Sequence, residues 1–235
     1  MLYSDQSVLE RSHAAQGAAV LSRCGLLSGL SRDEAALFRK IFIAAILATD
    51  MSVHRKLLAD TQELCDAAEA EAGAAAAAAA DAPQSPSFAA AAASTPPPAV
   101  APQPFRGGDD VPPERRTLAV SFLLHCADLC CPLMDVRASQ RVAASLSLEF
   151  ASQAAAEARL GLPITVVVAE NAAAKAKLEL SFLRFVVSPL FACLARAVPR
   201  LHGLLGRVHA NTDAWQRVLD AAKAEAAKSG LAGGV

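Results

Sequence analysis

The sequence has few aromatic residues and no long uninterrupted apolar run. Aromatic residues make up 5% of the 235 residues, with one Trp and one Tyr, and alanine supplies much of the 54% hydrophobic content. The most apolar stretch, residues 182–198, contains two arginines and a proline, so it lacks the roughly 18 continuous apolar residues of a membrane span. The first residues show neither a basic region nor an apolar one. We therefore expect no membrane span, no secretory signal and a cytoplasmic protein, although the parent protein could be membrane-attached through regions outside this chain.

Neither sign of charge is in excess. The chain carries 22 basic and 23 acidic residues, for a net charge of -1. A nucleic-acid-binding protein or a polybasic membrane-surface protein usually shows a clear basic surplus, so we expect neither.

The six cysteines lack the spacing of a metal knuckle or a disulfide framework. Cys126, Cys130 and Cys131 are close in sequence but form no CxxC pair. We expect reduced, buried thiols.

A change in composition interrupts the chain at residues 67–113. This segment is rich in alanine and then in proline, and its small side chains can bury little apolar area. We predict a disordered or loosely extended insert, with helix only through the alanines.

Helical periodicity dominates both flanks. The spacing of Ser7 and Glu10, and again of Ser31 and Glu34, fits a capping box, so helices are expected over residues 7–21 and 31–49. Further helices are expected after residue 52 and over 118–129, 136–160 and 175–197, the last kinked at Pro189. A final helix is expected to be capped by Asn211 or Thr212.

Two segments invite a more specific prediction. Residues 118–129 are apolar on nearly every side, so this helix is expected to be central and buried. Residues 164–169 could form a strand, but the sequence offers no second strand for pairing, so a buried loop is expected. No stretch of useful length alternates with period two, and the predicted fold class is all-α.

A chemical motif lies in the apolar helix, where His125-Cys126-Ala127-Asp128 places a carboxylate among apolar residues. This stretch resembles the "HCAD" helix of the class I 3',5'-cyclic-nucleotide phosphodiesterases. Four further segments resemble that family in the same order: residues 3–10 its "YND-SVLE", 47–54 its "LATDMS-H", 149–163 its "EEFF-Q…LGLP", and 182–191 its "FIDFIV-PLF". Residues 213–215 correspond to a terminal "NR-W" turn.

The resemblance implies a multi-helix bundle of the HD-type phosphodiesterase catalytic domain, with residues 1–235 forming an incomplete copy and 67–113 an insert within it. It implies hydrolysis of cyclic AMP or cyclic GMP to the 5'-monophosphate, in signal transduction, by a zinc ion and a magnesium ion sharing a hydroxide. Asp128 would contact both metals, and Glu10 and Thr49 would lie near the water shell of the second. Phe182 would clamp the purine, with Glu179, Met51 and Phe150 as further substrate-binding positions.

The departures from the family pattern are as informative as the matches. The "HNxxHAxDV" and "HD" motifs, which supply the acid histidine and three ligands of the tight metal, have no counterpart here. The purine-reading glutamine of the family corresponds to Glu179. We therefore assign no catalytic residue to this chain, and expect it to be inactive and to lose both metals when isolated.

Simpler explanations remain open for each position. Asp128 and Glu179 could be ordinary helix-surface charges, and Glu10 could serve only in a capping box. Thr49 could bond back to a helix carbonyl, and Phe182 could be a core residue. His54 and His125 are interpreted as structural. The alternative function is a non-catalytic helical pseudoenzyme module, and the apolar helix 118–129 could mediate self-association.

Overall fold

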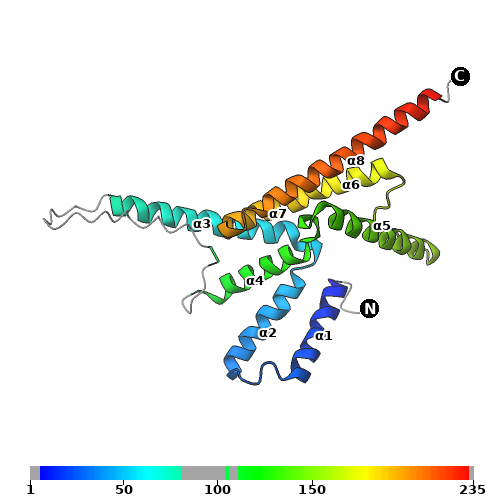
Figure 1. Cartoon of the computed structure of the whole chain (residues 1–235). Coiled ribbons are helices and arrows are strands. Elements are labelled where there is room, and N and C mark those ends of the chain that lie inside the picture. The colour runs from blue at the N-terminus through cyan, green and yellow to red at the C-terminus, as the bar shows by residue number, and fades with distance from the viewer. Residues whose placement is uncertain (1–5, 81–103, 106–110, 233–235) are drawn as a thin grey trace. The chain divides into compact units, whose positions relative to one another are not determined.

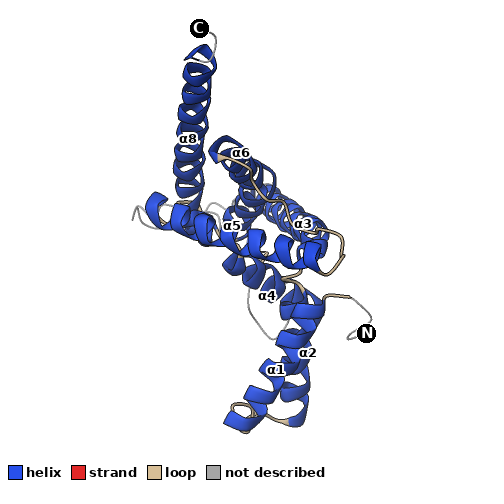
Figure 2. Cartoon of the chain, turned by 90° about the vertical axis from the view of Figure 1, so that its right-hand side faces the viewer, coloured by secondary structure: helices blue, strands red, loops and turns tan. Residues whose placement is uncertain are grey.

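The computed structural model describes residues 6–80, 104–105 and 111–232. Regular structure in these ranges is helical and includes no strand, which confirms the predicted all-α class (Figures 1 and 2). The α-helices are α1 (Val8–Cys24), α2 (Arg32–Leu47), α3 (His54–Ala80), α4 (Pro113–Asp128), α5 (Val136–Arg159), α6 (Ala172–Phe182), α7 (Ser188–Ala197) and α8 (Leu204–Ala232). Shorter helical segments are η2 (Met51–Val53), η3 (Cys131–Leu133), η4 (Leu183–Val187) and η5 (Pro199–Leu201).

The chain divides into two compact units. Unit 1 contains Met1–His125 and Arg196–Pro199, and unit 2 contains Cys126–Ala195 and Arg200–Val235. Each unit has its own buried apolar residues. Those of unit 1 include Ala45, Leu57, Cys65 and Phe122, and those of unit 2 include Leu183, Val187, Leu190, Val208 and Trp215.

The helix signals of unit 1 were confirmed at Ser31 and wrong at Ser7. The Ser31 backbone N–H donates to Glu34 Oε2 at 2.8 Å, and the Glu34 N–H donates to Ser31 Oγ at 3.3 Å, which completes the predicted capping box. Ser7 precedes α1 but its side chain makes no capping hydrogen bond. Its φ of 44° lies in the left-handed region, and its hydroxyl is committed to Asp50 instead. The spacing alone could not reveal this long-range competitor.

The alanine-rich part of the predicted insert is helical where it is described. Helix α3 continues through the alanines to Ala80, as alanine's helix propensity favours. The guanidinium of Arg196 anchors the middle of this helix, with Nη2 lying 2.6 Å from Asp66 Oδ1 and 2.9 Å from Glu69 Oε1. Residues 81–103 and 106–110, for which we predicted a disordered or extended insert, lie outside the described residues.

In unit 2, α6 packs along α8, and a π-helical turn connects α6 to α7 (Figure 1). The Ser188 N–H bonds to the carbonyl of Leu183 five residues back, immediately before Pro189. Proline has no N–H for the α-helical ladder, so the expected disturbance at Pro189 takes the form of this wide turn.

The predicted start of the last helix was wrong. Helix α8 begins at Leu204, and Asn211 and Thr212 lie inside it rather than at its cap. The Thr212 hydroxyl donates back to the Val208 carbonyl at 2.8 Å, and the buried Asn211 amide donates to the carbonyls of Met134 and Arg207. Polar residues that favour caps can also bond backward within a helix, and sequence spacing does not separate the two.

The loop between α5 and α6 is exposed, so the prediction that residues 164–169 are buried was wrong. The exposed fractions of Ile164 and Val167 are 59% and 66%. No regular structure forms in this segment, as expected for a strand without a partner in its own chain. Apolar composition had suggested burial, but the described residues provide no surface that covers it.

One helical stretch, Ala172–Ala197, is long and apolar enough by length and composition to cross a membrane. The same property is common in core helices of soluble proteins. Its buried side chains, including Leu180, Leu183 and Val187, and the packing of α6 on α8 favour a core helix.

Candidate functional site

The segment that joins α2 to α3 is fastened by the carboxylate of Asp50. Its Oδ1 accepts from the Ser52 N–H at 2.7 Å, which caps η2, and its Oδ2 accepts from the Ser7 hydroxyl at 2.6 Å. These hydrogen bonds hold the pKa of Asp50 below its ordinary value, and the hydrogen bond from Ser7 has the largest effect. The start of α1 and the end of α2 are therefore tied together at one carboxylate.

Three of the predicted site residues belong to this region of unit 1. Thr49 precedes Asp50, and its hydroxyl donates to the Ile46 carbonyl at 2.8 Å, which is the back-bonding alternative that the sequence left open. Met51 is exposed, and Glu10 is half-buried in the first turn of α1. The Ser7–Asp50 bond brings the segments of Glu10 and Thr49 together, and close packing of Gly17 against Phe42 holds α1 on α2.

A buried histidine pair is the contact that sequence reasoning missed. Nδ1 of His54, at the start of α3, lies 2.9 Å from Nε2 of His125 in α4. Their exposed fractions are 5% and 0%, and burial lowers the pKa of His54. Both residues belong to segments that resemble the family, but neither spacing nor composition indicated that they touch.

Asp128 lies at the exposed C-terminal end of α4, so the expectation that the helix is buried around it needs correction. Within α4 the buried residues are Ser121, Phe122, His125 and Cys126, whereas Val120, Leu123 and Leu124 are about 40% exposed. A helix that is apolar on every side gives no signal of which face is covered. Asp128 itself is exposed, and its role as a metal ligand stays a prediction.

The remaining predicted positions belong to unit 2. Glu179 and Phe182 are both half-buried on α6, three residues apart and therefore on the same face. Burial raises the pKa of Glu179, and the positive charge of Lys175 lowers it by a smaller amount. Phe150 is half-buried on α5. Thus Glu10, Thr49 and Met51 share unit 1, and Asp128, Phe150, Glu179 and Phe182 share unit 2.

The residues that the structure describes do not fit a tight metal centre. In the part of the chain that the structure describes, no group of three or more His, Cys, Asp or Glu side chains converges on a point that could hold a metal. A tight zinc site requires three or four protein ligands. Asp128 alone cannot supply one.

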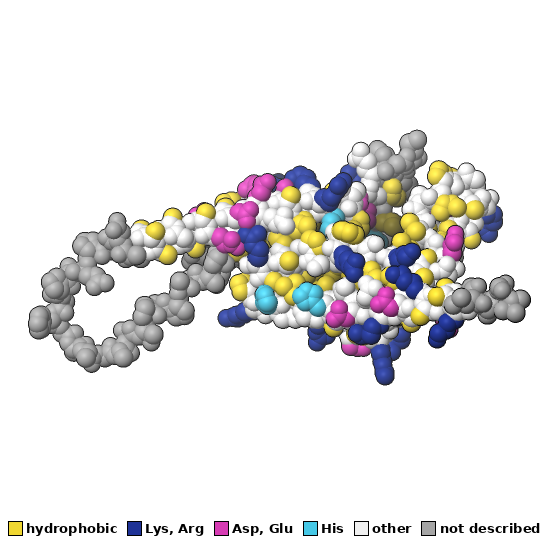
Figure 3. Space-filling model, turned by 90° about the horizontal axis from the view of Figure 1, so that it is seen from above, with side chains coloured by type: hydrophobic (Ala, Val, Ile, Leu, Met, Phe, Trp, Pro, Cys, Tyr) yellow, Lys and Arg dark blue, Asp and Glu magenta, His cyan; other side chains and the backbone are white. Residues whose placement is uncertain are grey.

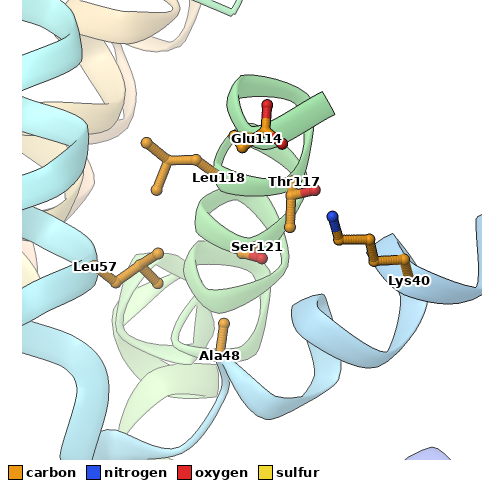
Figure 4. Close-up of a pocket in the computed structure, with 7 residues that line it drawn as sticks. All are labelled: Lys40, Ala48, Leu57, Glu114, Thr117, Leu118 and Ser121. Carbon is orange, nitrogen blue, oxygen red and sulfur yellow. The ribbon is translucent and has the colours of Figure 1, made fainter. Parts of the chain in front are cut away.

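Unit 1 contains a pocket of about 310 Å³ between α2, α3 and α4 (Figure 4). Leu57, Leu118 and Ala48 form its apolar part, and the Lys40 side chain extends toward Thr117. Glu114 and Ser121 complete the lining. None of the predicted site residues lines this pocket, so it does not coincide with the nucleotide site that the sequence indicated.

Side chains of both charge signs are interspersed with apolar ones on the face shown in Figure 3. Such a mixed surface gives that face no single electrostatic preference for a polyanion.

Comparisons with known proteins agree with the motif order. The family model described as 3'5'-cyclic nucleotide phosphodiesterase matches residues 1–208. The chain belongs to this family. The family uses divalent metals, although the described residues of this chain show no cluster that would hold one.

Curated relatives include the probable 3',5'-cyclic-AMP phosphodiesterase pde-4 of Caenorhabditis elegans, 26% identical over 219 residues. Isoform F of the Drosophila melanogaster 3',5'-cyclic-AMP phosphodiesterase is 25% identical over 222 residues. The matches cover 92% and 93% of this chain but only 28% and 29% of those relatives.

Solved structures show the same fold. The phosphodiesterase domain of the RhoPDE fusion protein from the choanoflagellate Salpingoeca rosetta aligns with a TM-score of 0.72 and 26% identity. A second structure of the rhodopsin phosphodiesterase domain from that organism gives 0.73 and 25%. They cover 94% and 96% of this phosphodiesterase-family chain, which in turn spans 59% of each solved chain.

Proposed function

We propose that this chain is part of a catalytic domain that hydrolyses 3',5'-cyclic nucleotides to 5'-monophosphates. The observation that carries the proposal is the family match over residues 1–208, in the order of the motifs in the sequence. The curated relatives are named as cyclic-AMP phosphodiesterases, which favours cyclic AMP as a substrate.

The proposed contribution of this chain is mainly to substrate binding. Glu179 and Phe182 lie on one half-buried face of α6, where an aromatic ring can stack on a purine and a carboxylate can accept from an exocyclic amino group. Phe150 and Met51 are proposed as further pocket residues. Cyclic GMP remains a second possible substrate in this proposal.

The zinc and magnesium ions of the family are proposed to belong to the complete domain. Asp128 would be the one ligand from this chain, and Glu10 and Thr49 would lie near bound water. The Ser7–Asp50 hydrogen bond supports the last pair, because it holds their two segments together. Since the described residues form no multi-ligand cluster, the isolated chain is proposed to bind neither ion tightly and to be inactive.

A chimeric enzyme tests this proposal. The upstream part of the Salpingoeca rosetta phosphodiesterase domain would be joined to the N-terminus of this chain, and hydrolysis of cyclic AMP and cyclic GMP measured beside the isolated chain. We expect turnover only in the chimera, and its loss in Asp128→Asn. The matched control is Asp33→Asn, another exposed carboxylate, which should retain activity.

Two outcomes would contradict the proposal. A folded chimera without turnover would argue against a catalytic role. Turnover by the isolated chain that disappears in Asp128→Asn would show that the chain needs no upstream half.

A second candidate function is a non-catalytic helical module that binds a nucleotide or a protein partner. The exposure of Asp128 and the lack of a metal-binding cluster among the described residues favour it. Nucleotide binding without turnover in the folded chimera would support this alternative.

We further propose that the chain is cytoplasmic and that the exposed side of α4 can mediate association. Val120, Leu123 and Leu124 supply that apolar surface. In a complete domain, residues upstream of this chain can pack against the same surface. The proposed association through α4 therefore applies to the isolated chain.

A further inference from the structure

The link between α4 and α5, residues 129–135, is held by two side chains of α8. Asn211 Nδ2 lies 3.0 Å from the carbonyl oxygen of Met134. Arg207 Nη1 lies 3.3 Å from the carbonyl oxygen of Leu133. Residues four positions apart lie on the same face of a helix, one turn apart, so one face of α8 donates to two successive carbonyls of the link.

The link also has an ordered backbone of its own. The Leu133 N–H donates to the Cys130 carbonyl at 2.8 Å, within the turn that forms η3. The Met134 N–H donates to the Cys131 carbonyl at 3.2 Å. Asp135 then caps α5 with its side chain. The link is therefore a fixed connection, and a movement of it displaces the end of α4 on one side and the start of α5 on the other.

The Asn211 side chain is 1% exposed but only partly satisfied. Its amide nitrogen donates to the carbonyls of Met134 and Arg207, whereas its Oδ1 is buried without a hydrogen-bond partner among the described residues. A buried acceptor left unpaired destabilises the folded state, and an apolar side chain of similar shape avoids that loss. Fold stability alone therefore does not account for an asparagine at this position. Its hydrogen bond to the link does.

The same helix supports the other candidate positions of unit 2. Helix α8 packs along α6, and its contacts extend to η4 and α5 (Figure 1). Glu179 and Phe182 lie on α6, and Phe150 lies on α5. One helix thus contacts both the link that follows Asp128 and the elements that carry the proposed purine-binding side chains.

We propose that Asn211 is a positioning residue of the catalytic domain, because its amide fixes the link after Asp128 on α8. This inference rests on the proposed function, since it assigns Asn211 a part in turnover. Loss of the amide leaves Glu179 and Phe182 in place but releases the link, so the end of α4 that carries Asp128 is less well held. Misplacement of a group that acts in the transition state lowers the rate more than it weakens substrate binding.

The first measurement is hydrogen exchange of the native full chain and of Asn211→Leu, read by mass spectrometry of peptides. Leucine is close to asparagine in size and has no donor, so it removes the hydrogen bonds without leaving a large cavity. Peptides covering residues 129–136 should exchange about fivefold faster, and peptides from the middle of α5 should keep the native rate. The matched control is Thr212→Val, which removes only the hydroxyl that donates to Val208 within α8, and it should leave the link unchanged.

A second variant keeps the test informative if Asn211→Leu does not fold. Arg207 is exposed, so Arg207→Met removes the neighbouring donor to the link and keeps most of the apolar stem. It should speed exchange in residues 129–136 as well. The effect should be smaller than that of Asn211→Leu, because an exposed hydrogen bond of 3.3 Å is weaker than a buried one of 3.0 Å.

The second measurement is the kinetics of the chimeric enzyme. Asn211→Leu should lower kcat for cyclic AMP about tenfold or more and change KM by less than about twofold. Thr212→Val should keep both constants. Circular dichroism at the assay temperature establishes that each variant is fully folded, so a lower kcat is not a smaller folded fraction.

Four results would overturn the proposal. One is a native exchange rate for residues 129–136 in both Asn211→Leu and Arg207→Met. Another is faster exchange that extends equally through α5, which would make Asn211 a general stabilising residue. A third is an active chimera whose kcat is unchanged in a folded Asn211→Leu variant. A folded native chimera without turnover is distinct from these, because it contradicts the proposed function itself and removes the positioning role with it.

Discussion

Nδ1 of His54 lies 2.9 Å from Nε2 of His125, and both imidazoles are buried. At this distance one ring must donate a proton that the other accepts. The geometry therefore suits two neutral rings and disfavours a state in which both rings are protonated. The contact joins the first residue of α3 to α4 within unit 1.

The histidine pair predicts that the folded state loses stability as the solution becomes mildly acidic. Burial places the pKa of His54 below its ordinary value of 6.5, so the unfolded chain takes up the proton first when the pH falls. The free energy of unfolding should therefore decrease as the pH falls below about 6.5, down to the lower pKa of the folded state. Urea denaturation between about pH 7.5 and 5.5 measures this slope.

The matched variants for this measurement are His54→Gln and His209→Gln. Replacing His54 should flatten the slope, whereas His209 is exposed on α8 and its replacement should leave the slope unchanged. A slope that persists fully in His54→Gln would contradict the assignment.

A second prediction concerns the bond between Ser7 and Asp50. Ser7→Ala and Asp50→Ala should each lower the free energy of unfolding, and the two effects should not add, because each variant removes the same hydrogen bond. A coupling of about 0.5–1.5 kcal/mol is expected from a double-mutant cycle. Ser7→Gly should cost less than Ser7→Ala, since glycine accepts the φ of 44° without strain. Additive single effects would show that the bond contributes nothing.

A third prediction concerns metal content. The chain purified without a chelator should contain essentially no zinc by elemental analysis, because the described residues offer no set of three or four ligands. Stoichiometric zinc would mean that ligands were missed. His54 and His125 would then be the first residues to replace.

A fourth prediction concerns base selection, and it applies to the chimeric enzyme. An ionised Glu179 can accept from the adenine amino group but cannot donate to guanine O6, so cyclic GMP should be disfavoured. Glu179→Gln restores a donor and should tighten purine binding by about tenfold or more. Michaelis constants for both nucleotides in native, Glu179→Gln and Glu149→Gln enzymes measure this. The exposed Glu149 is the control, and an unchanged constant in Glu179→Gln would place Glu179 outside the pocket.

Local signals in the sequence predicted most of the helices, because capping and periodicity act over a few residues. Ser31 with Glu34 marked the start of α2 correctly, and Gly161, with a φ of 66°, follows the end of α5 as expected. The failures came from long-range partners. Ser7 bonds to Asp50 across 43 positions and Asn211 to Met134 across 77, and neither partner is visible in local spacing.

The residues of the candidate site were predicted from family motifs and not from their own physical chemistry. The sequence therefore could not indicate which of these side chains are buried or which of them meet. Nothing in the apolar helix around Leu123 distinguishes a covered face from an open one, so the sequence left open whether Asp128 is buried or exposed. The contact of His54 with His125 depends on how α3 meets α4, which periodicity does not encode.

The short segment Arg196–Pro199 belongs to unit 1 although the residues on both sides of it belong to unit 2. A fragment ending at His125 would therefore lack Arg196, the cation that binds Asp66 and Glu69 on α3. A fragment starting at Cys126 would carry that arginine without its acidic partners. No single cleavage point yields both units whole, so the contributions of the two units are better separated by point substitutions in the intact chain than by expressing its halves.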